Sequence, residues 1–562
     1  MRANDGTRTG GQILIDQLEI HGVTHAFCVP GESYLAALDA LHGSKIALTV
    51  CRHEGAAAMM AEAVGKTTGR PGICFVTRGP GATNASAGVH IARQDSSPMI
   101  LFVGQIGRDM REREAFQEVD YRAMFGTVAK WATEIDDAAR IPEIVSRAFH
   151  TACNGRPGPV VIALPDDMLT ERALASDATA VEPVEIWPGL TDMSRLQKML
   201  WAAKRPIALI SGSRWSEAAS AAMMRFAERF ALPVATTFRR AHLFDAMHPC
   251  YAGDFGIGPN PKLLARVKGA DLVLLIGDRM SEMASQSYTA FGIPEPQMKL
   301  VHVHPGSEEL GRVYHPALAI NASPTAFCAS LEGLQPPNEI AWRGESDIAH
   351  ADFLTWTEKA TAQPGPINLG EIMVWLRDNL PKDAIITNGA GNFATWINRF
   401  YRFRQYASLV GPTSGSMGYG LPAALAMKTL HKDRTVVCIA GDGDFMMTGN
   451  DFATASQYDL PIIVVIWDNG TYGTIRMHQE REYPGRVVAT ELKNPDFVAY
   501  AKAFGGFGVL VEKTADFAAA FAAAQKSGKP AIIHLKVDAE PLTPGMSLSA
   551  IRERALGAAG KP

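Results

Sequence analysis

Two polar residues in the last third of the chain follow two apolar stretches, at a spacing that could build a metal site. Gly441-Asp442-Gly443 comes directly after the apolar run 434–440, and Asn469 follows the run 461–467. Asp442 and Asn469 lie 27 positions apart, which is enough for one helix between neighbouring parallel strands. We therefore expect both side chains at the same carboxyl edge of one sheet, where open α/β sheets bind ligands.

The chemistry that this pair could support is magnesium and phosphate binding. A carboxylate, an amide oxygen and a nearby main-chain carbonyl form a hard oxygen site that leaves octahedral positions for a phosphate. The glycines beside Asp442 let the backbone approach a phosphate closely, and a following helix N-terminus favours negative charge. The alternative is an ordinary tight turn with a turn asparagine, which the two strand contexts make the second choice.

Glu54 is a third residue with chemical potential. It lies where the apolar run 47–51 stops and an alanine-rich helix is predicted to begin. Acidic residues favour the first turn of any helix, so the position alone indicates no function.

The elements that must position these residues indicate an α/β fold. Runs of aliphatic and β-branched residues recur, each followed by a glycine-rich turn and a helix-periodic stretch, which is typical of doubly wound parallel sheets. Strands such as 271–276 and 461–467 carry continuous rather than alternating apolar residues, which predicts helices on both faces of the sheet. Two aperiodic stretches, 170–189 and 334–345, are interpreted as linkers. They delimit three predicted domains and a C-terminal tail, at residues 1–170, 190–335, 360–545 and 546–562.

Composition narrows the class of protein further. The 562 residues are 47% hydrophobic and 20% charged, with 54 basic and 58 acidic side chains and a net charge of -4. Without a basic block, a nucleic-acid partner is not expected. No apolar run approaches the length of a membrane helix, the N-terminus lacks an apolar signal region, and the seven cysteines form no C-x-x-C pair. We therefore expect a cytoplasmic protein with reduced thiols and no membrane association.

The Gly-Asp-Gly motif with its placed asparagine resembles the diphosphate-binding motif of thiamine diphosphate (ThDP) enzymes. The order of the blocks is similar to the pyrimidine-binding, central and diphosphate-binding domains of the acetolactate synthase and pyruvate oxidase group. The resemblance implies that Asp442, Asn469 and the carbonyl of Thr471 bind Mg²⁺. It also implies a set of cofactor-binding residues: Ala390, Gly391, Asn392, Gly441, Gly443, Asp444, Phe445, Tyr472 and Gly473.

The same resemblance gives roles to residues outside that motif. Arg52-His53-Glu54 and the segment 77–84 resemble the family's catalytic-glutamate region, in which a carboxylic acid contacts the aminopyrimidine and makes its amine a base. Met417 corresponds to the apolar residue that bends the cofactor, although a core methionine is the more common fate. Phe116 and Gln117 correspond to residues that contact the bound substrate.

Several positions depart from acetolactate synthases, and they concern the substrate pocket. Glu32 stands where the synthases usually carry a second glycine, and it could transfer protons or repel an anionic acceptor. Asp166 replaces a common lysine, and His478 replaces a tryptophan. Arg279 corresponds to the arginine that holds the carboxylate of the second 2-oxo acid, with a surface salt bridge as an equal alternative. The glycines of 253–258 fit either an FAD site or an ordinary loop.

The predicted activity is decarboxylation of a pyruvate-like 2-oxo acid, with ligation of the enamine to a second carbonyl. The alternative within the enzyme class is a 2-oxo acid decarboxylase, or a C–C lyase or aldehyde carboligase with another substrate. A dinucleotide-dependent oxidoreductase would need a G-x-G-x-x-G fingerprint, of which we find no good instance. A catalytically silent relative would lack Glu54, Asp442 or Asn469, and all three are present. The resemblance also implies a homodimer or homotetramer with active sites at the subunit interface.

Overall fold

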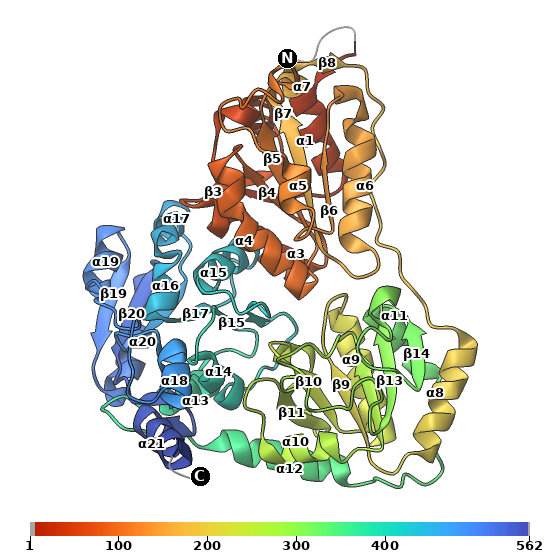
Figure 1. Cartoon of the computed structure of the whole chain (residues 1–562), viewed down its shortest axis with the longest axis vertical. Helices are drawn as coiled ribbons and strands as arrows, with labels where there is room; N and C mark the ends of the chain where they lie inside the picture. The colour runs from red at the N-terminus through yellow and green to blue at the C-terminus, as the bar shows by residue number, and fades with distance from the viewer. Residues whose placement is uncertain (1–5, 560–562) are drawn as a thin grey trace. The chain divides into compact units, whose positions relative to one another are not determined.

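The computed structural model describes residues 6–559, so residues 1–5 of the first predicted domain and 560–562 of the predicted tail lie outside the described residues. The chain divides into two compact units, the second of which begins at Glu185 (Figure 1). The predicted boundaries of the three domains stay a prediction.

The first unit is built on a six-stranded parallel sheet with the order β3-β2-β4-β5-β7-β6. Its strands are β2 (His25–Cys28), β3 (Ala47–Val50), β4 (Gly72–Val76), β5 (Met99–Gln105), β6 (Trp131–Glu134) and β7 (Pro159–Pro165). Its helices are α1 (Gly10–Ile20), α2 (Leu35–His42), α3 (Glu54–Thr68), α4 (Pro80–Asp95), α5 (Tyr121–Phe125), α6 (Ile141–Cys153) and α7 (Asp166–Thr170). A short antiparallel pair, β1 (Arg8–Thr9) and β8 (Arg172–Ala173), joins the two ends of this unit.

The second unit contains two further six-stranded parallel sheets (Figure 1). The first has the order β11-β10-β9-β12-β13-β14, with β9 (Pro206–Ile210), β10 (Val234–Thr237), β11 (Tyr251–Phe255), β12 (Leu272–Ile276), β13 (Lys299–His304) and β14 (Leu318–Asn321). Its helices are α8 (Leu190–Ala202), α9 (Glu217–Phe230), α10 (Pro261–Lys268) and α11 (Pro324–Ser330). Alternate residues of β9 enter two different cores, Ala208 and Ile210 one and Ile207 and Leu209 the other, so both faces of this sheet are buried.

The last sheet has the order β16-β15-β17-β18-β20-β19. Its strands are β15 (Ile385–Asn388), β16 (Leu409–Val410), β17 (Val436–Gly441), β18 (Ile463–Asp468), β19 (Phe507–Val511) and β20 (Ala531–Lys536). Its helices are α13 (Leu369–Asn379), α14 (Ala394–Phe400), α15 (Gly420–Leu430), α16 (Asp442–Met446), α17 (Phe452–Gln457), α18 (Gly473–Glu482), α19 (Phe497–Ala503) and α20 (Phe517–Ser527). The predicted fold class, α/β with doubly wound parallel sheets, is therefore confirmed.

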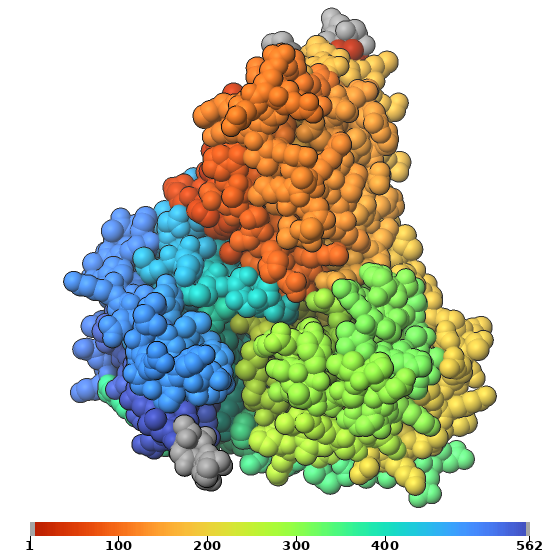
Figure 2. Space-filling view, in the orientation of Figure 1, coloured from red at the N-terminus to blue at the C-terminus, as the bar shows by residue number. Residues whose placement is uncertain are grey.

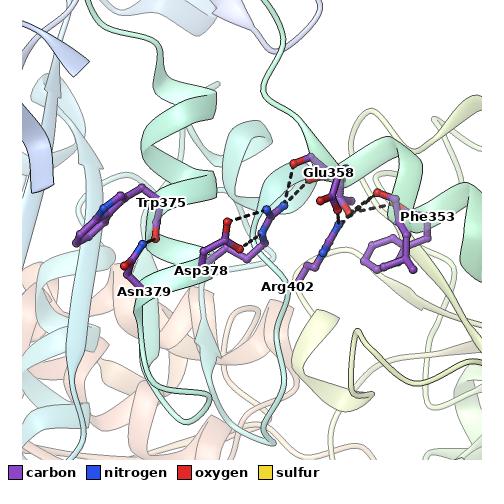
Figure 3. A network of polar contacts seen from close by, with 9 residues as sticks. Phe353, Glu358, Trp375, Asp378, Asn379 and Arg402 are labelled. Atoms are coloured by element: carbon purple, nitrogen blue, oxygen red, sulfur yellow. Dashed lines mark hydrogen bonds and ion pairs between the residues drawn. The ribbon is translucent and has the colours of Figure 1, made fainter. Parts of the chain in front are cut away.

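A helix that follows the second predicted linker, α12 (Glu345–Glu358), ends against two arginines of the last sheet's layer. Arg377 in α13 donates to the carbonyl oxygens of Thr357 (2.7 Å) and Glu358 (3.3 Å), and Arg402 donates to the Glu358 carboxylate (2.6 Å; Figure 3). Asp378 in turn accepts from Arg377 (2.7 Å). Cations at this position satisfy the last carbonyls of the helix and complement the negative end of its dipole.

The predicted C-terminal tail is folded as far as it is described. A hairpin of β21 (Pro541–Thr543) and β22 (Met546–Ser547) leads into α21 (Leu548–Ala559), which packs against α18. Leu542, Leu548 and Ile551 form its small core, and dark blue atoms of the last described residues are visible on the face shown in Figure 2. Across residues 6–559, none of the helices combines the length and the apolar character that crossing a membrane requires.

Candidate cofactor site

The last sheet brings Asp442 and Asn469 to one edge. Strands β17 and β18 are parallel neighbours in register from Val437 opposite Ile463 to Gly441 opposite Trp467, and the two residues follow directly. Both face one cavity of about 250 Å³. Most of the sequence-predicted cofactor residues line this cavity: Ala390, Gly391, Asn392, Met417, Gly441, Asp442, Gly443, Asp444, Asn469, Thr471, Tyr472 and Gly473. Phe445 is instead buried beside it, edge-to-face against Phe497 and Tyr500.

Asp444 shapes the wall of the cavity. Its Oδ1 accepts hydrogen bonds from the backbone of Ala390 (3.0 Å) and Gly418 (2.9 Å), and so joins two loops that are distant in sequence. A β-carbon on Gly389 would lie 2.0 Å from the same oxygen, so that position requires glycine. Burial raises the pKa of Asp444 to about 7.

Asp442 is held by a neighbour that the motif does not include. Its Oδ2 accepts from the backbone of Gly470 (3.0 Å) and from Nδ2 of Asn494 (2.6 Å). Burial raises the pKa of Asp442, and the hydrogen bond from Asn494 offsets only part of this effect. A buried carboxylate whose charge is disfavoured in this way is one that a cation would stabilise.

Asn494 also donates to Asp468 (2.7 Å), so one amide bridges two carboxylates. Burial works against the charge of Asp468, but hydrogen bonds from His534 (2.8 Å) and Lys536 (2.8 Å) outweigh it and hold the pKa of Asp468 below its ordinary range. The charge of Asp468 is therefore compensated within the protein, whereas that of Asp442 is not.

The turn after β18 lines the cavity through Asn469, Thr471, Tyr472 and Gly473. Oδ1 of Asn469 accepts from the backbone of Thr471 (3.2 Å), and the Thr471 hydroxyl donates to the carbonyl of Thr490 (2.8 Å). Within residues 6–559, no group of three or more Asp, Glu, His and Cys side chains forms a metal site. Metal binding at this edge would accordingly need the mixed carboxylate, amide and main-chain donors that Mg²⁺ accepts.

The first unit has a separate polar edge. Glu54 begins α3, whose N-cap His53 accepts from the backbone of Gly55 (3.0 Å), and the Glu54 Oε2 accepts from Nδ2 of Asn84 (2.9 Å) in α4. Strands β3, β2, β4 and β5 are neighbours in that order, so Glu54 shares its edge with Glu32 after β2. Asp166 begins α7 after β7, further along the same edge.

The segment with Phe116 and Gln117 lies beside the loop after β4. Gln117 has φ of +65°, and a β-carbon on Gly79 would lie 2.7 Å from its own, so the two loops are in close contact. Glu118 holds the turn by accepting from the backbone of Glu112 (2.7 Å) and Ala115 (2.9 Å). Phe116 is 72% exposed and therefore free to meet a ligand.

Two substrate candidates of the second unit stand apart from the cavity. Arg279 follows β12, with its backbone N–H bonded to the Asp278 carboxylate (2.6 Å), and His478 lies on α18 in contact with Arg481. Neither residue lines the cavity that Asp442 and Asn469 face. One glycine of the segment 253–258 also has a packing explanation, because a β-carbon on Gly256 would lie 2.5 Å from Oδ1 of Asp254 and 3.2 Å from Cα of Phe238.

Sequence reasoning missed Asn494, Asp468 and Arg78. Asn494 lies in an irregular loop 25 positions after Asn469, with no motif to mark it. Asp468 is visible only as the last residue of an apolar strand. Arg78 lies in the segment 77–84, which resembles the family's catalytic-glutamate region. Its partner Glu32 is 46 positions away, and the two meet because strands β2 and β4 are neighbours in the sheet.

Family models match all three parts of the chain. They are the N-terminal TPP-binding domain of thiamine pyrophosphate enzymes (residues 8–124), the central domain of these enzymes (193–331) and their C-terminal TPP-binding domain (389–535). Thiamine pyrophosphate is ThDP. The fold and the cavity thus define a ThDP-dependent enzyme.

Relatives extend this likeness over nearly the whole chain. The acetolactate synthase large subunit of Parasynechococcus marenigrum is 31% identical, over 94% of this chain and 88% of the relative. The acetolactate synthase isozyme 2 large subunit of Escherichia coli is 28% identical, over 94% and 95%, and the acetolactate synthase of Bacillus subtilis is 27% identical, over 94% and 93%. The chain therefore belongs to the acetolactate synthase-like family of ThDP-dependent enzymes.

Proposed function

We propose that this protein decarboxylates a pyruvate-like 2-oxo acid with ThDP and Mg²⁺ and ligates the product to a second carbonyl compound. The observation that carries the proposal is the meeting of Asp442, Asn469 and Thr471 at one glycine-walled cavity, in a chain of the ThDP family. The names of the relatives, which are acetolactate synthases, supply the reaction type. A small-molecule 2-oxo acid is the corresponding substrate class.

In this proposal Mg²⁺ is held by Asp442, Asn469 and the main-chain carbonyl of Thr471. The donor set supports it, because within residues 6–559 no cation pairs with the buried Asp442 carboxylate, while Asp468 next to it already has His534 and Lys536. Five glycines line the wall, Gly391, Gly415, Gly441, Gly443 and Gly473, and glycine lets a diphosphate approach the backbone closely. Met417 in the wall supplies an apolar surface for the rings.

Bound ThDP supplies the electron sink that decarboxylation needs. The task of Glu54 is to hold and return a proton at Oε1, the carboxylate oxygen that Asn84 does not engage. Asn84 orients the carboxylate, and Phe116 and Gln117 contact the substrate. The protein thereby contributes position, proton transfer and exclusion of water.

A decarboxylase, or a C–C lyase or aldehyde carboligase, is the second candidate. The observation that favours it is Glu32, an acid at the same sheet edge as Glu54 that could protonate a product before a second carbonyl arrives. Asp166 and His478, with Arg279, stay candidate substrate residues in either case. FAD binding, a homodimer or homotetramer with shared sites, and a cytoplasmic location also stay predictions.

A paired assay of the protein and its Glu54→Gln variant with ThDP, Mg²⁺ and pyruvate tests the proposal. We expect acetolactate and CO₂ from the wild type and a rate at least about 100-fold lower from the variant, which is the usual contribution of a general acid–base group. Glu143→Gln is the matched control, since Glu143 also occupies the first turn of a helix in the same unit but is exposed.

The product, identified by NMR, separates the candidates. Acetaldehyde in place of acetolactate would favour the decarboxylase. Full activity of Glu54→Gln would exclude the assigned proton relay. ThDP binding without turnover would move the search to other 2-oxo acids, hydroxyketones and diketones.

A further inference from the structure

An arginine lies between two of the residues assigned to the substrate side of the first unit. Arg78 follows β4 and Glu32 follows the neighbouring strand β2, and Nη2 of Arg78 lies 3.1 Å from Oε1 of Glu32. Nε of the same guanidinium donates to the carbonyl oxygen of Phe116 (3.1 Å). Its central carbon lies 5.9 Å from the centroid of the Phe116 ring. Arg78 thus contacts both Glu32 and the loop that carries Gln117.

The backbone around Arg78 is fixed on both sides. Its N–H donates to Oγ of Ser33 (3.2 Å), the residue after Glu32, and the following N–H of Gly79 donates to the hydroxyl of Tyr121 (2.7 Å). The Arg78 side chain is only 11% exposed, and its Nη1 is buried with no hydrogen-bond partner in the described part of the chain. The cation is therefore held in place rather than solvated, and its charge acts on Glu32.

The pair matters because Glu54 shares this edge. Gly81, three residues after Arg78, is so close that its β-carbon would lie 3.5 Å from Oε1 of Glu54, the oxygen assigned to proton transfer. A 2-oxo acid that approaches Glu54 brings a carboxylate of its own. Glu32, which is 66% exposed, would repel that anion if it stood alone, because like charges repel each other more strongly as they approach.

We propose that Arg78 is a specificity-determining residue, which neutralises Glu32 and so lets the site admit the carboxylate of a 2-oxo acid. The proposal rests on the proposed function. The role of Glu32 also differs in this proposal, because an acid that is paired with Arg78 no longer repels anionic substrates.

Binding of two probes to the Mg²⁺ and ThDP holoenzyme tests this proposal by calorimetry. Methyl acetylphosphonate is an anionic analogue of pyruvate that cannot lose CO₂, and methyl pyruvate is the corresponding uncharged ester. For Arg78→Gln we expect affinity for the phosphonate to fall at least about 10-fold, while affinities for the ester and for ThDP change less than about 2-fold. The double variant with Glu32→Gln should recover most of the loss, since the repelling charge is gone.

Two further variants exclude a merely structural explanation. Arg78→Lys keeps the charge and should bind the phosphonate nearly as the wild type does. Arg140→Gln removes the arginine of an exposed ion pair elsewhere in the unit, with Glu143 (2.8 Å), and should change nothing. Equal loss for both probes, no recovery in the double variant, or an Arg78→Lys as weak as Arg78→Gln would overturn the role of Arg78.

The two proposals fail in different ways. A wild type that binds the phosphonate but turns over no 2-oxo acid contradicts the proposed reaction. In that case, the comparison of phosphonate binding by the wild type and Arg78→Gln still tests the role of Arg78. A wild type that makes acetolactate, with Arg78→Gln binding the phosphonate equally well, upholds the reaction and overturns the role of Arg78. A wild type that neither binds the phosphonate nor turns over 2-oxo acids overturns both.

Discussion

Asp442 and Asp468 are two carboxylates joined by one amide, Asn494, and among the described residues cations pair only with Asp468. Asp442→Asn keeps the shape of the side chain and removes its charge, so Mg²⁺-dependent ThDP binding should weaken. For Asn494→Ala we expect the affinity for ThDP in Mg²⁺ to fall about 10- to 100-fold, which is the usual loss for a residue that orients a metal ligand. For Asp442→Asn we expect the same affinity to fall at least about 100-fold. Calorimetric titration with ThDP in Mg²⁺ and in EDTA measures both.

Asp433→Asn, an exposed acid just before β17, is the control for charge alone. The prediction is wrong if Asp442→Asn binds ThDP as the wild type does in Mg²⁺, or if the loss is the same in EDTA. If Asn494→Ala lowers the ThDP affinity more than Asp442→Asn does, the amide that bridges the two carboxylates, rather than the proposed metal ligand, determines ThDP binding.

At the scale of single residues, the sequence predicts site residues where they belong to a motif at the end of a strand. Asp442 and Asn469 were predictable because both follow apolar strands and the spacing fits one crossover helix. Asn494 was not, because an irregular loop has no period and a lone asparagine is an ordinary loop residue. The pairing of Arg78 with Glu32 depends on which strands are neighbours in the sheet. The order of strands in a parallel sheet cannot be predicted from local sequence.

At the scale of elements, α21 is joined to α18 by a buried carboxylate. Glu480 is fully buried and accepts from Nε (2.7 Å) and Nη2 (2.5 Å) of Arg552 in α21, from Arg476 (3.0 Å) and from the backbone of Gly485 (2.9 Å). The hydrogen bonds from Arg552, which outweigh burial, lower the pKa of Glu480 to about 2. Since Gly473 and Ile475 at the start of α18 line the cofactor cavity together with Leu542, this contact supports the site.

The sign of the pH dependence follows from the lowered pKa. The folded state holds the Glu480 proton less tightly than the unfolded chain, whose pKa is near the ordinary 4.5, so the contact contributes fully above that pH and is lost as pH falls toward 2. Arg552→Gln should weaken the protection of α21 amides by about 1–2 kcal/mol at pH 7, allowing for the partial exposure of Arg552, and by much less near pH 3.

Hydrogen exchange is the appropriate measurement, because it reports local opening in a protein with several cores. Arg554→Gln is the matched control, since Arg554 lies on the same helix, is exposed and donates to the sulfur of Met546 rather than to a carboxylate. An Arg552 effect that is equal at pH 7 and pH 3 would contradict the charge-based explanation. The sequence indicated only a tail here, since the partner of Arg552, Glu480, is 72 positions away and no local pattern links the two.

At the scale of the whole molecule, the chain carries two polar sheet edges on different sheets, Glu54 on one and Asp442 on another. The family resemblance implies that a site joins the first domain of one subunit to the last domain of its partner. A complementation experiment tests this implication. Glu54→Gln and Asp442→Asn chains are each expected to be inactive, and the two are then unfolded together, refolded and assayed.

If sites are shared between subunits, each mixed dimer has one site with both substitutions and one with neither. Random reassociation makes half of the dimers mixed, so about 25% of wild-type activity should return. If each chain forms a complete site by itself, every site keeps one substitution and no activity returns. Light scattering on the refolded sample provides the mass of the assembly, and a monomeric protein would exclude shared sites. The experiment therefore decides together whether the protein is an oligomer and whether Glu54 and Asp442 of one active site come from different chains.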